Sequence, residues 1–184
     1  LFEYARDLGI EIFSTPFDST SVDFLANFDV PAFKIASFEL NDHALVKKVA
    51  ETKKPMILST GMASLEEIGD SLEVARDGGC PELCLLYCVS GYPTPVAEAN
   101  VLTLVELGKK FGCVVGFSDH TLGTAVSVAA VSVGASVVEK HVTLNRDDGG
   151  PDAAFSLEPS ELKTLVSDCR VAWESLGLAS FVRK

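Results

Sequence analysis

The chain has 184 residues, of which 47% are hydrophobic and 22% are charged, and its formal net charge is -11 at pH 7. A chain of this length and composition can bury a substantial core, which indicates one folded domain and excludes a disordered protein. The acidic balance argues against nucleic acid and anionic membranes as partners, because both select clustered Lys and Arg.

The cysteines and the first residues indicate where the protein resides. Five cysteines are present and none belongs to a C-x-x-C pair. Cys84 and Cys88 lie in an apolar run and are expected to be small core residues. No signal-peptide pattern and no apolar stretch long enough for a membrane span is found, so we expect a soluble protein of the reducing cytoplasm.

Short β-branched runs alternate with amphipathic segments along the chain. Residues 1–9 have the spacing of a helix end. Strands are predicted over 10–13, 32–36, 55–58, 83–89, 114–117 and 136–141, and helices over 19–28, 42–52, 64–78, 101–111, 121–133 and from 159 to a stop at Gly177. Such alternation indicates a parallel sheet with helices packed against it.

Two architectures fit this alternation, an open doubly wound sheet and a closed barrel. The glycine-rich dinucleotide fingerprint follows none of the predicted strands, which disfavours the open sheet. A complete barrel requires eight strand–helix units and about 250 residues. The sequence therefore predicts an α/β fold of the (β/α)8 TIM-barrel type that is incomplete, with about six of the eight units spread over residues 1–184.

Polar residues follow nearly every predicted strand. In a barrel, the carboxyl ends of all strands lie on one face, where active sites are found. One such Ser or Thr is usually a turn former or helix cap, but six polar strand ends in succession indicate a site. The residues are Ser14, Thr15, Lys34, Ser37, Glu39, Ser59, Thr60, Ser90, Ser118, Asp119, His120, Glu139, Lys140 and His141.

Two of the three histidines close consecutive predicted strands. Neighbouring strands lie about 4.8 Å apart, so His120 and His141 can share one divalent ion such as Mn²⁺ or Mg²⁺ and leave positions for substrate oxygens. Glu139 faces the same side as His141 and could orient a metal-bound water. The alternative is a pair of loop histidines with ordinary hydrogen bonds.

Two lysines lie at predicted strand ends, where a buried ammonium requires an anion. Lys34 is expected to bind a phosphate or carboxylate, and a Schiff-base lysine is the rival interpretation. Lys140 should face away from His141 and extend along the helix layer toward solvent.

Five motifs together resemble the sialic acid synthase family, in order along nearly the whole chain. They are residues 31–39 (PAFKIASFE), 58–62 (LSTGM), 91–95 (GYPTP), 117–123 (FSDHTLG) and 139–141 (EKH). The Lys-Ile-Ala-Ser-Phe-Glu segment and residues 148–159 are most similar to the pseudaminic acid synthase branch.

The resemblance implies condensation of phosphoenolpyruvate with an N-acetylated amino sugar to give a nine-carbon 2-keto acid of the pseudaminic or sialic acid type, with release of phosphate. It places Thr15, Lys34, Ser37, Ser59 and Ser118 at phosphoenolpyruvate, with His120 and His141 on the metal ion. Ser90 replaces an Asn of sialic acid synthases, and Glu39 lies beside Ser37. Glu139, Tyr92 and Asp152 are expected to be catalytic, the last two near the sugar.

The departures from the family pattern lead us to expect a fragment. Family members are homodimers that begin with two further strand–helix units, which carry a catalytic Glu and a second phosphoenolpyruvate-binding Lys. They also have a C-terminal antifreeze-like domain. Neither part has a counterpart in the 184 residues. Two other functions therefore stay open: a non-catalytic barrel remnant that binds a ligand or a partner chain, and a Schiff-base aldolase using Lys34.

Overall fold

Five parallel strands form one sheet in the computed structural model, which describes residues 1–179. The strands are β1 (Phe33–Ile35), β2 (Met56–Ser59), β3 (Leu83–Cys88), β4 (Val114–Asp119) and β5 (Val137–Lys140). Each strand pairs with the next one along the chain. A doubly wound sheet reverses its strand order at a switch point, so this unbroken order is that of a barrel.

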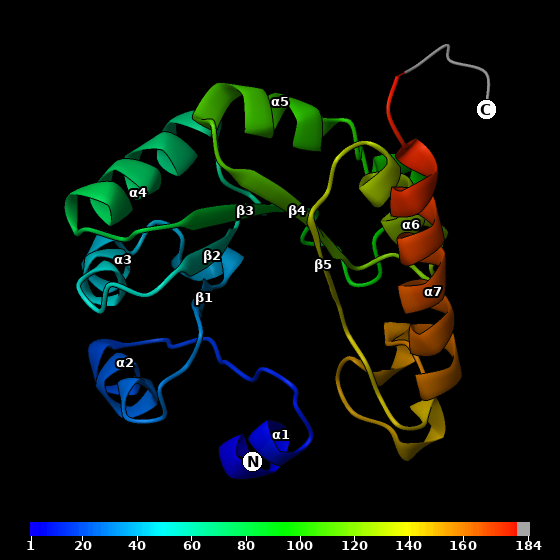
Figure 1. Ribbon diagram of the computed structural model, residues 1–184, viewed down its shortest axis with the longest axis horizontal. Coiled ribbons are helices and arrows are strands. Elements are labelled where there is room, and N and C mark those ends of the chain that lie inside the picture. Colours follow the sequence, from blue (N-terminus) through cyan, green and yellow to red (C-terminus); the bar gives the residue numbers. More distant parts are fainter. Residues whose placement is uncertain (180–184) are drawn as a thin grey trace.

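Helices lie along the outer side of this sheet, except the first one, which lies beyond β1 and stacks Phe2 on Phe28 (Figure 1). They are α1 (Phe2–Asp7), α2 (Ser19–Ala26), α3 (His43–Ala50), α4 (Leu65–Asp77), α5 (Thr103–Phe111), α6 (Ala125–Ser132) and α7 (Pro159–Leu176). Ser64 and Glu67 form a capping box at the start of α4, and Pro159 opens α7. Within residues 1–179, no helix has the length and apolar character required to cross a membrane.

The main core lies between the sheet and these helices. Phe33, Ile35, Met56, Leu58 and Leu85 are fully buried in a cluster with side chains of the surrounding helices. Because side chains alternate along a strand, the residues between them face the inner side of the sheet. That inner set is small or polar toward the carboxyl ends of the strands, and it comprises Lys34, Ser59, Cys88, Gly116, Ser118 and Glu139.

One side-chain contact demonstrates how strongly the sheet is curled. Lys34 Nζ of β1 lies 3.6 Å from Glu139 Oε2 of β5. A flat five-stranded sheet would place these strands about 19 Å apart, four spacings of about 4.8 Å, and both side chains would stand parallel to each other. The sheet is therefore a half-barrel, and its inner side is a concave face on which opposite strands meet.

The predicted strand over residues 10–13 is the one strand that the structure does not contain. This segment runs beside β1, but the only backbone hydrogen bond between them joins Lys34 N to Ser14 O at 3.5 Å. Ile10 and Phe13 remain 60% and 40% exposed. A strand is stabilised by ladder bonds and by burial of alternate side chains, and these residues have little of either.

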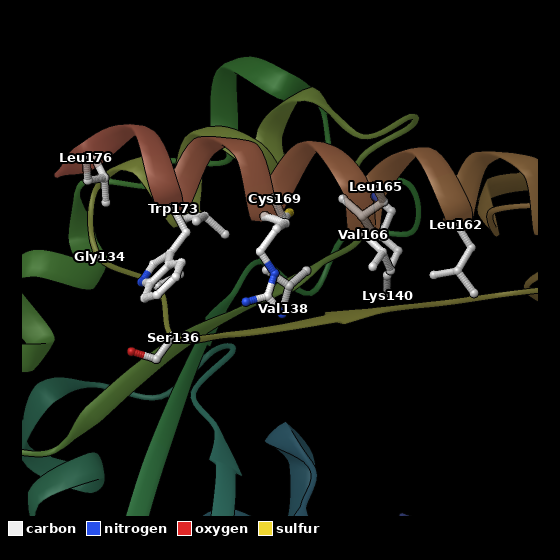
Figure 2. Close-up of a pocket in the computed structure, with 13 residues that line it drawn as sticks. Gly134, Ser136, Val138, Lys140, Leu162, Leu165, Val166, Cys169, Trp173 and Leu176 are labelled. Carbon is white, nitrogen blue, oxygen red and sulfur yellow. The ribbon is translucent and has the colours of Figure 1, made fainter. Parts of the chain in front are cut away.

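Helix α7 covers the sheet less completely than its sequence pattern predicts. Of its apolar side chains only Leu165 is buried, while Trp173 is 60% exposed. A groove of about 650 Å³ separates α7 from β5, and residues such as Leu162, Val166 and Trp173 line its helix side (Figure 2). The outer edge of β5 is unpaired among the described residues, and this groove lies between that edge strand and α7.

Gly116→Ala is expected to destabilise the protein, because the inner face has no room for a side chain at this position of β4. A Cβ there would lie 2.5 Å from Leu86 Cδ2 and 2.5 Å from Val137 O. We expect a loss of about 1–3 kcal/mol in the free energy of unfolding, measured by urea denaturation.

Gly108→Ala in α5 is the matched control, since its Cβ would meet only Val115 at ordinary contact distances of 3.5 and 3.6 Å. This variant should be as stable as the parent or up to about 1 kcal/mol more stable. Equal stability of the two variants would contradict the tight inner packing at Gly116.

Candidate active site

Lys34 forms the floor of the concave face. The residue is only 7% exposed, and its ammonium donates hydrogen bonds to Ser59 Oγ at 2.7 Å and to Ile35 O at 3.1 Å. The carboxylate of Glu139 is its nearest anion, at 3.6 Å. A lysine has three N–H donors, so two are used in hydrogen bonds and the third can serve an anion on this face.

A hydrogen-bonded chain leads from Lys34 to the histidines. Ser118 Oγ donates to Glu139 Oε1 at 2.6 Å and lies 3.4 Å from His120 Nε2. A hydroxyl has one proton to donate, and the short distance indicates that Ser118 donates it in a hydrogen bond to the carboxylate of Glu139. The lone pair on His120 Nε2 therefore does not receive the Ser118 proton and remains available to another ligand.

The two histidine rings lie side by side at the ends of β4 and β5. Their centroids are 5.4 Å apart and the rings are nearly perpendicular. His120 Nδ1 lies 2.9 Å from Val89 O, and since a carbonyl can only accept, this nitrogen carries the proton. His141 Nδ1 is 3.4 Å from Asp152 Oδ2, a contact that suits a protonated nitrogen in the same way. His120 thus keeps Nε2 unprotonated, the form of an imidazole nitrogen that binds a metal ion.

The metal prediction depends on these two rings and on ligands from outside the protein. Within residues 1–179, no three His, Cys, Asp or Glu side chains are grouped so that they could hold an ion by themselves. A two-imidazole site leaves most coordination positions to water or substrate oxygens, which is the arrangement that Lewis-acid catalysis requires. The two imidazole nitrogens therefore fit a divalent ion whose other ligands are water or substrate oxygens.

Aromatic rings cover the histidines on one side. The ring centroid of Tyr92 lies 4.3 Å from that of His120 and 5.7 Å from that of Phe155. Phe155 also packs against His141 at 5.0 Å. Asp152, half-exposed at the rim, completes this wall. The wall combines an apolar surface with a hydroxyl and a carboxylate, which suits a ligand with both C–H and O–H groups.

A second group of small polar side chains converges on Gly61. Gly61 N donates to Ser37 Oγ at 3.2 Å, and Ser37 Oγ lies 3.3 Å from Cys88 Sγ. A Cβ on Gly61 would come within 2.4 Å of Ser90 Oγ, so only glycine fits. Ser90 Oγ is itself buried and has no hydrogen-bond partner in the described part of the chain. Such an orphaned hydroxyl marks a place for a polar ligand atom.

Two of the predicted site residues are less closely connected to this network. One carboxylate oxygen of Glu39 is buried with no hydrogen-bond partner among the described residues. Thr15 is half-buried in the segment beside β1, and in the described structure its side chain bonds to none of the groups above. The structure therefore gathers Lys34, Ser37, Ser59, Ser90, Ser118, Glu139, His120, His141, Tyr92 and Asp152 on one face and leaves Thr15 at its edge.

Sequence reasoning missed three features of this region. Cys88 is buried as expected, but its thiol lies at the site beside Ser37. Phe155 belongs to the segment 148–159, yet its contact with His141 follows only from the fold of the loop after β5. Lys140 faces away from His141 as predicted, but the expectation that it reaches solvent is wrong. It is buried and paired with Asp119 at 3.0 Å, because an ammonium in the helix layer needs a counter-charge.

Burial shifts the pKa values of His120 and Tyr92, whose rings pack against each other. It lowers the pKa of His120 below its ordinary value of 6.5, and the hydrogen bond to Val89 O opposes this shift in part. Burial also raises the pKa of the Tyr92 hydroxyl, as do the negative charges near it. Near neutral pH the site thus presents a neutral imidazole and a neutral phenol.

Comparisons with known proteins identify relatives of this chain. The sequence profile of the NeuB family matches residues 1–180. A pseudaminic acid synthase of Helicobacter pylori is 42% identical over 177 residues, which are 96% of this chain and 52% of that protein. An N,N'-diacetyllegionaminic acid synthase of Campylobacter jejuni is also 42% identical, over 96% of this chain and 54% of its own length.

A solved structure has the same fold. The N-acetylneuraminic acid synthetase of Leptospira borgpetersenii, crystallised with citrate, superposes with a TM-score of 0.94 at 33% identity. The match covers 99% of this chain and 64% of that one. The chain spans about half the length of the curated relatives it matches.

The lowered pKa of His120 predicts a pH-dependent contribution to stability. The unfolded chain binds a proton at His120 as the pH falls through about 6.5, whereas the folded chain stays neutral until its lower pKa is reached. This histidine therefore reduces the free energy of unfolding as the pH falls from about 7.5 to about 5.5.

Urea denaturation at the two pH values measures this effect, with His120→Gln as the reference. The other ionisable groups are common to both proteins, so we expect the wild type to lose more stability than the variant over this interval. An equal loss in both would contradict a neutral, buried His120.

Proposed function

Because the chain belongs to the NeuB family, we propose that it forms the ligand-binding part of an active site that condenses phosphoenolpyruvate with an N-acetylated amino sugar. The sugar would react in its open, aldehyde form. A carbon–carbon bond forms between C3 of phosphoenolpyruvate and the aldehyde carbon, water adds at C2, and the C–O bond to phosphate breaks. The product is a 2-keto acid of the pseudaminic or sialic acid type.

The arrangement around Lys34 is the observation that carries this proposal. The ammonium is buried, is held by Ser59 and Ile35, and has Glu139 3.6 Å away. A buried cation that is not fully neutralised attracts a small anion strongly, because little water screens the charge. We therefore assign the carboxylate or phosphate of phosphoenolpyruvate to Lys34.

Hydroxyl groups on the same face would complete the binding of phosphoenolpyruvate. Ser37 and Ser90 lie together at Gly61, and the buried, unpartnered hydroxyl of Ser90 supports a ligand there. Ser59 and Ser118 border Lys34 and Glu139. Thr15 would approach from the edge beside β1. Directed donors of this kind stabilise charge without the cost of reorienting solvent.

His120 and His141 would hold a divalent ion, Mn²⁺ or Mg²⁺, through their Nε2 atoms. Such an ion supplies Lewis-acid polarisation of the sugar's aldehyde group. The protein's own part is to orient both rings, His120 through Val89 O and His141 through Asp152. Glu139, held by Ser118 and Lys34, is placed to orient the water that adds at C2.

The sugar would lie against the wall formed by Tyr92, Phe155 and Asp152. The aromatic rings offer a surface for the C–H faces of a sugar, while the phenol and carboxylate can bond its hydroxyl and amide groups. Relatives named for pseudaminic and for diacetyllegionaminic acid are equally identical to this chain, so overall identity does not separate the two products. We assign that selection to the side chains of this wall.

The complete activity would involve residues beyond the half-barrel. The family resemblance assigns a catalytic Glu and a second phosphoenolpyruvate-binding Lys to two further strand–helix units, and the chain spans about half of its relatives. We propose that the full-length enzyme is a cytoplasmic homodimer with an antifreeze-like domain. Five free cysteines in the described chain are compatible with a reducing compartment.

Lys34→Met tests the anion site directly. Removing the ammonium should weaken phosphoenolpyruvate binding by roughly tenfold to a hundredfold, since a hydrogen bond to a charged group is worth about 1.5–3 kcal/mol. Isothermal titration calorimetry of the 184-residue chain measures the affinity.

Lys48→Met is the matched control, because Lys48 forms an ion pair with Asp23 on the surface far from the concave face. Its affinity for phosphoenolpyruvate should equal that of the wild type. Unchanged binding by Lys34→Met, or no binding by the wild type, would refute the proposed site.

Lys34 should not form a Schiff base. Its hydrogen bonds to oxygen acceptors and its contact with Glu139 suit a protonated ammonium, whereas a Schiff-base lysine must be a neutral amine. Treatment with borohydride in the presence of pyruvate or sugar should leave the mass of the protein unchanged. A covalent adduct on Lys34 in the mass spectrum would favour an aldolase instead.

A further inference from the structure

A buried ion pair joins the last residues of β4 and β5. Asp119 and Lys140 are partners in the register of the two strands and close the ladder between them. Lys140 Nζ lies 3.0 Å from Asp119 Oδ2, and the side chains are 4% and 0% exposed. Figure 2 shows Lys140 on the side of β5 that faces α7, away from the concave face.

Every polar atom of this pair has a partner. Asp119 Oδ1 accepts from Thr121 N at 2.8 Å, and Asp119 Oδ2 accepts from Ser127 Oγ at 2.5 Å. Lys140 Nζ also donates to Thr121 O at 2.5 Å. Such a network ties β4, the loop after it, α6 and β5 into one unit. Its members hold each other in one arrangement, because any displacement would leave a buried charge unsatisfied.

The residues that follow the pair are the two histidines. His120 comes directly after Asp119 and His141 directly after Lys140. The backbone ladder of β4 and β5 ends at the pair, so no further ladder bond sets the distance between the chains at the histidines. Since side chains alternate, the pair lies behind the sheet while the imidazoles lie on its concave face.

We propose that the Asp119–Lys140 pair is a positioning device, which sets the separation of the His120 and His141 rings so that both can bind one divalent ion. This inference rests on the proposed function, in which the two imidazoles hold that ion. The pair acts through the backbone and through Thr121, and it touches neither ion nor substrate. It explains why the strand ends carry two charges in the helix layer, where apolar residues would pack as well.

The alternative is that the pair only stabilises the fold. In that case, replacing both charges by neutral side chains would restore stability and function together. Under the positioning role, the same replacement restores stability but leaves the rings without their fixed spacing. Stability and metal affinity therefore separate the two roles when they are measured on the same variants.

The test compares Lys140→Met with the double variant Asp119→Asn/Lys140→Met. Lys140→Met leaves a buried, unpaired carboxylate and should lower the unfolding midpoint, whereas the double variant should recover most of that loss. Mn²⁺ binding, measured by calorimetry on the 184-residue chain, should stay roughly tenfold or more weaker in both variants than in the wild type. A crystal structure of the double variant should show a ring separation different from 5.4 Å.

Two further variants provide the controls. Asp23→Asn/Lys48→Met removes a surface pair and should change neither property. Lys140→Arg keeps the charge and should bind Mn²⁺ more tightly than Lys140→Met does, which also decides the question if the double variant does not fold.

Each outcome of the comparison has a distinct meaning. Wild-type Mn²⁺ affinity in the double variant, or an Arg variant no better than the Met variant, would overturn the positioning role and leave the proposed function intact. Absence of Mn²⁺ binding by the wild type would refute the metal part of the proposed function, and the positioning role with it. Phosphoenolpyruvate binding at Lys34 is measured separately and is affected by neither result.

Discussion

The contact between Lys34 and Glu139 is the constraint on which the rest of the concave face depends. The two residues belong to the first and last strands of the sheet, and their charged atoms lie 3.6 Å apart only because the sheet curls. Glu139 in turn accepts a hydrogen bond from Ser118, which leaves the Nε2 lone pair of His120 free of that hydroxyl proton. The ammonium and the two imidazoles, the groups that we propose bind the anion and the metal ion, thus lie on one face because the half-barrel brings its first and last strands together.

Because side chains alternate along each strand, the two sides of the sheet have different compositions and different roles. The outward residues, such as Phe33, Met56 and Leu85, pack with the helices and supply most of the hydrophobic stabilisation. The inward residues are therefore free to be polar, at a cost that hydrogen bonds offset. Asp119 and Lys140 depart from this division, because they place charges in the helix layer. They stand directly before the two histidines, and the positioning role proposed above would account for this departure.

The parts of the site that could be predicted are those that depend on local sequence. The polar ends of successive strands, the two histidines, and the opposite orientations of Lys140 and His141 all follow from chain order and alternation. The wrong details depend on contacts with distant residues. Residues 10–13 have the composition of a strand but too few hydrogen-bond partners to form one. Lys140 was expected to extend toward solvent, but it forms a buried ion pair with Asp119.

The sequence by itself determined the alternation of strands and helices, the barrel type of the fold and the residue types available for binding an anion and a metal ion. These properties follow from periodicity and side-chain chemistry, which act over a few residues. Only the tertiary structure decided which groups meet: Lys34 with Glu139, Ser90 with Gly61, and Phe155 with His141. The physical reason is that the curl of the sheet and the course of its loops arise from packing over the whole molecule, and no local pattern encodes the distance between side chains on opposite strands.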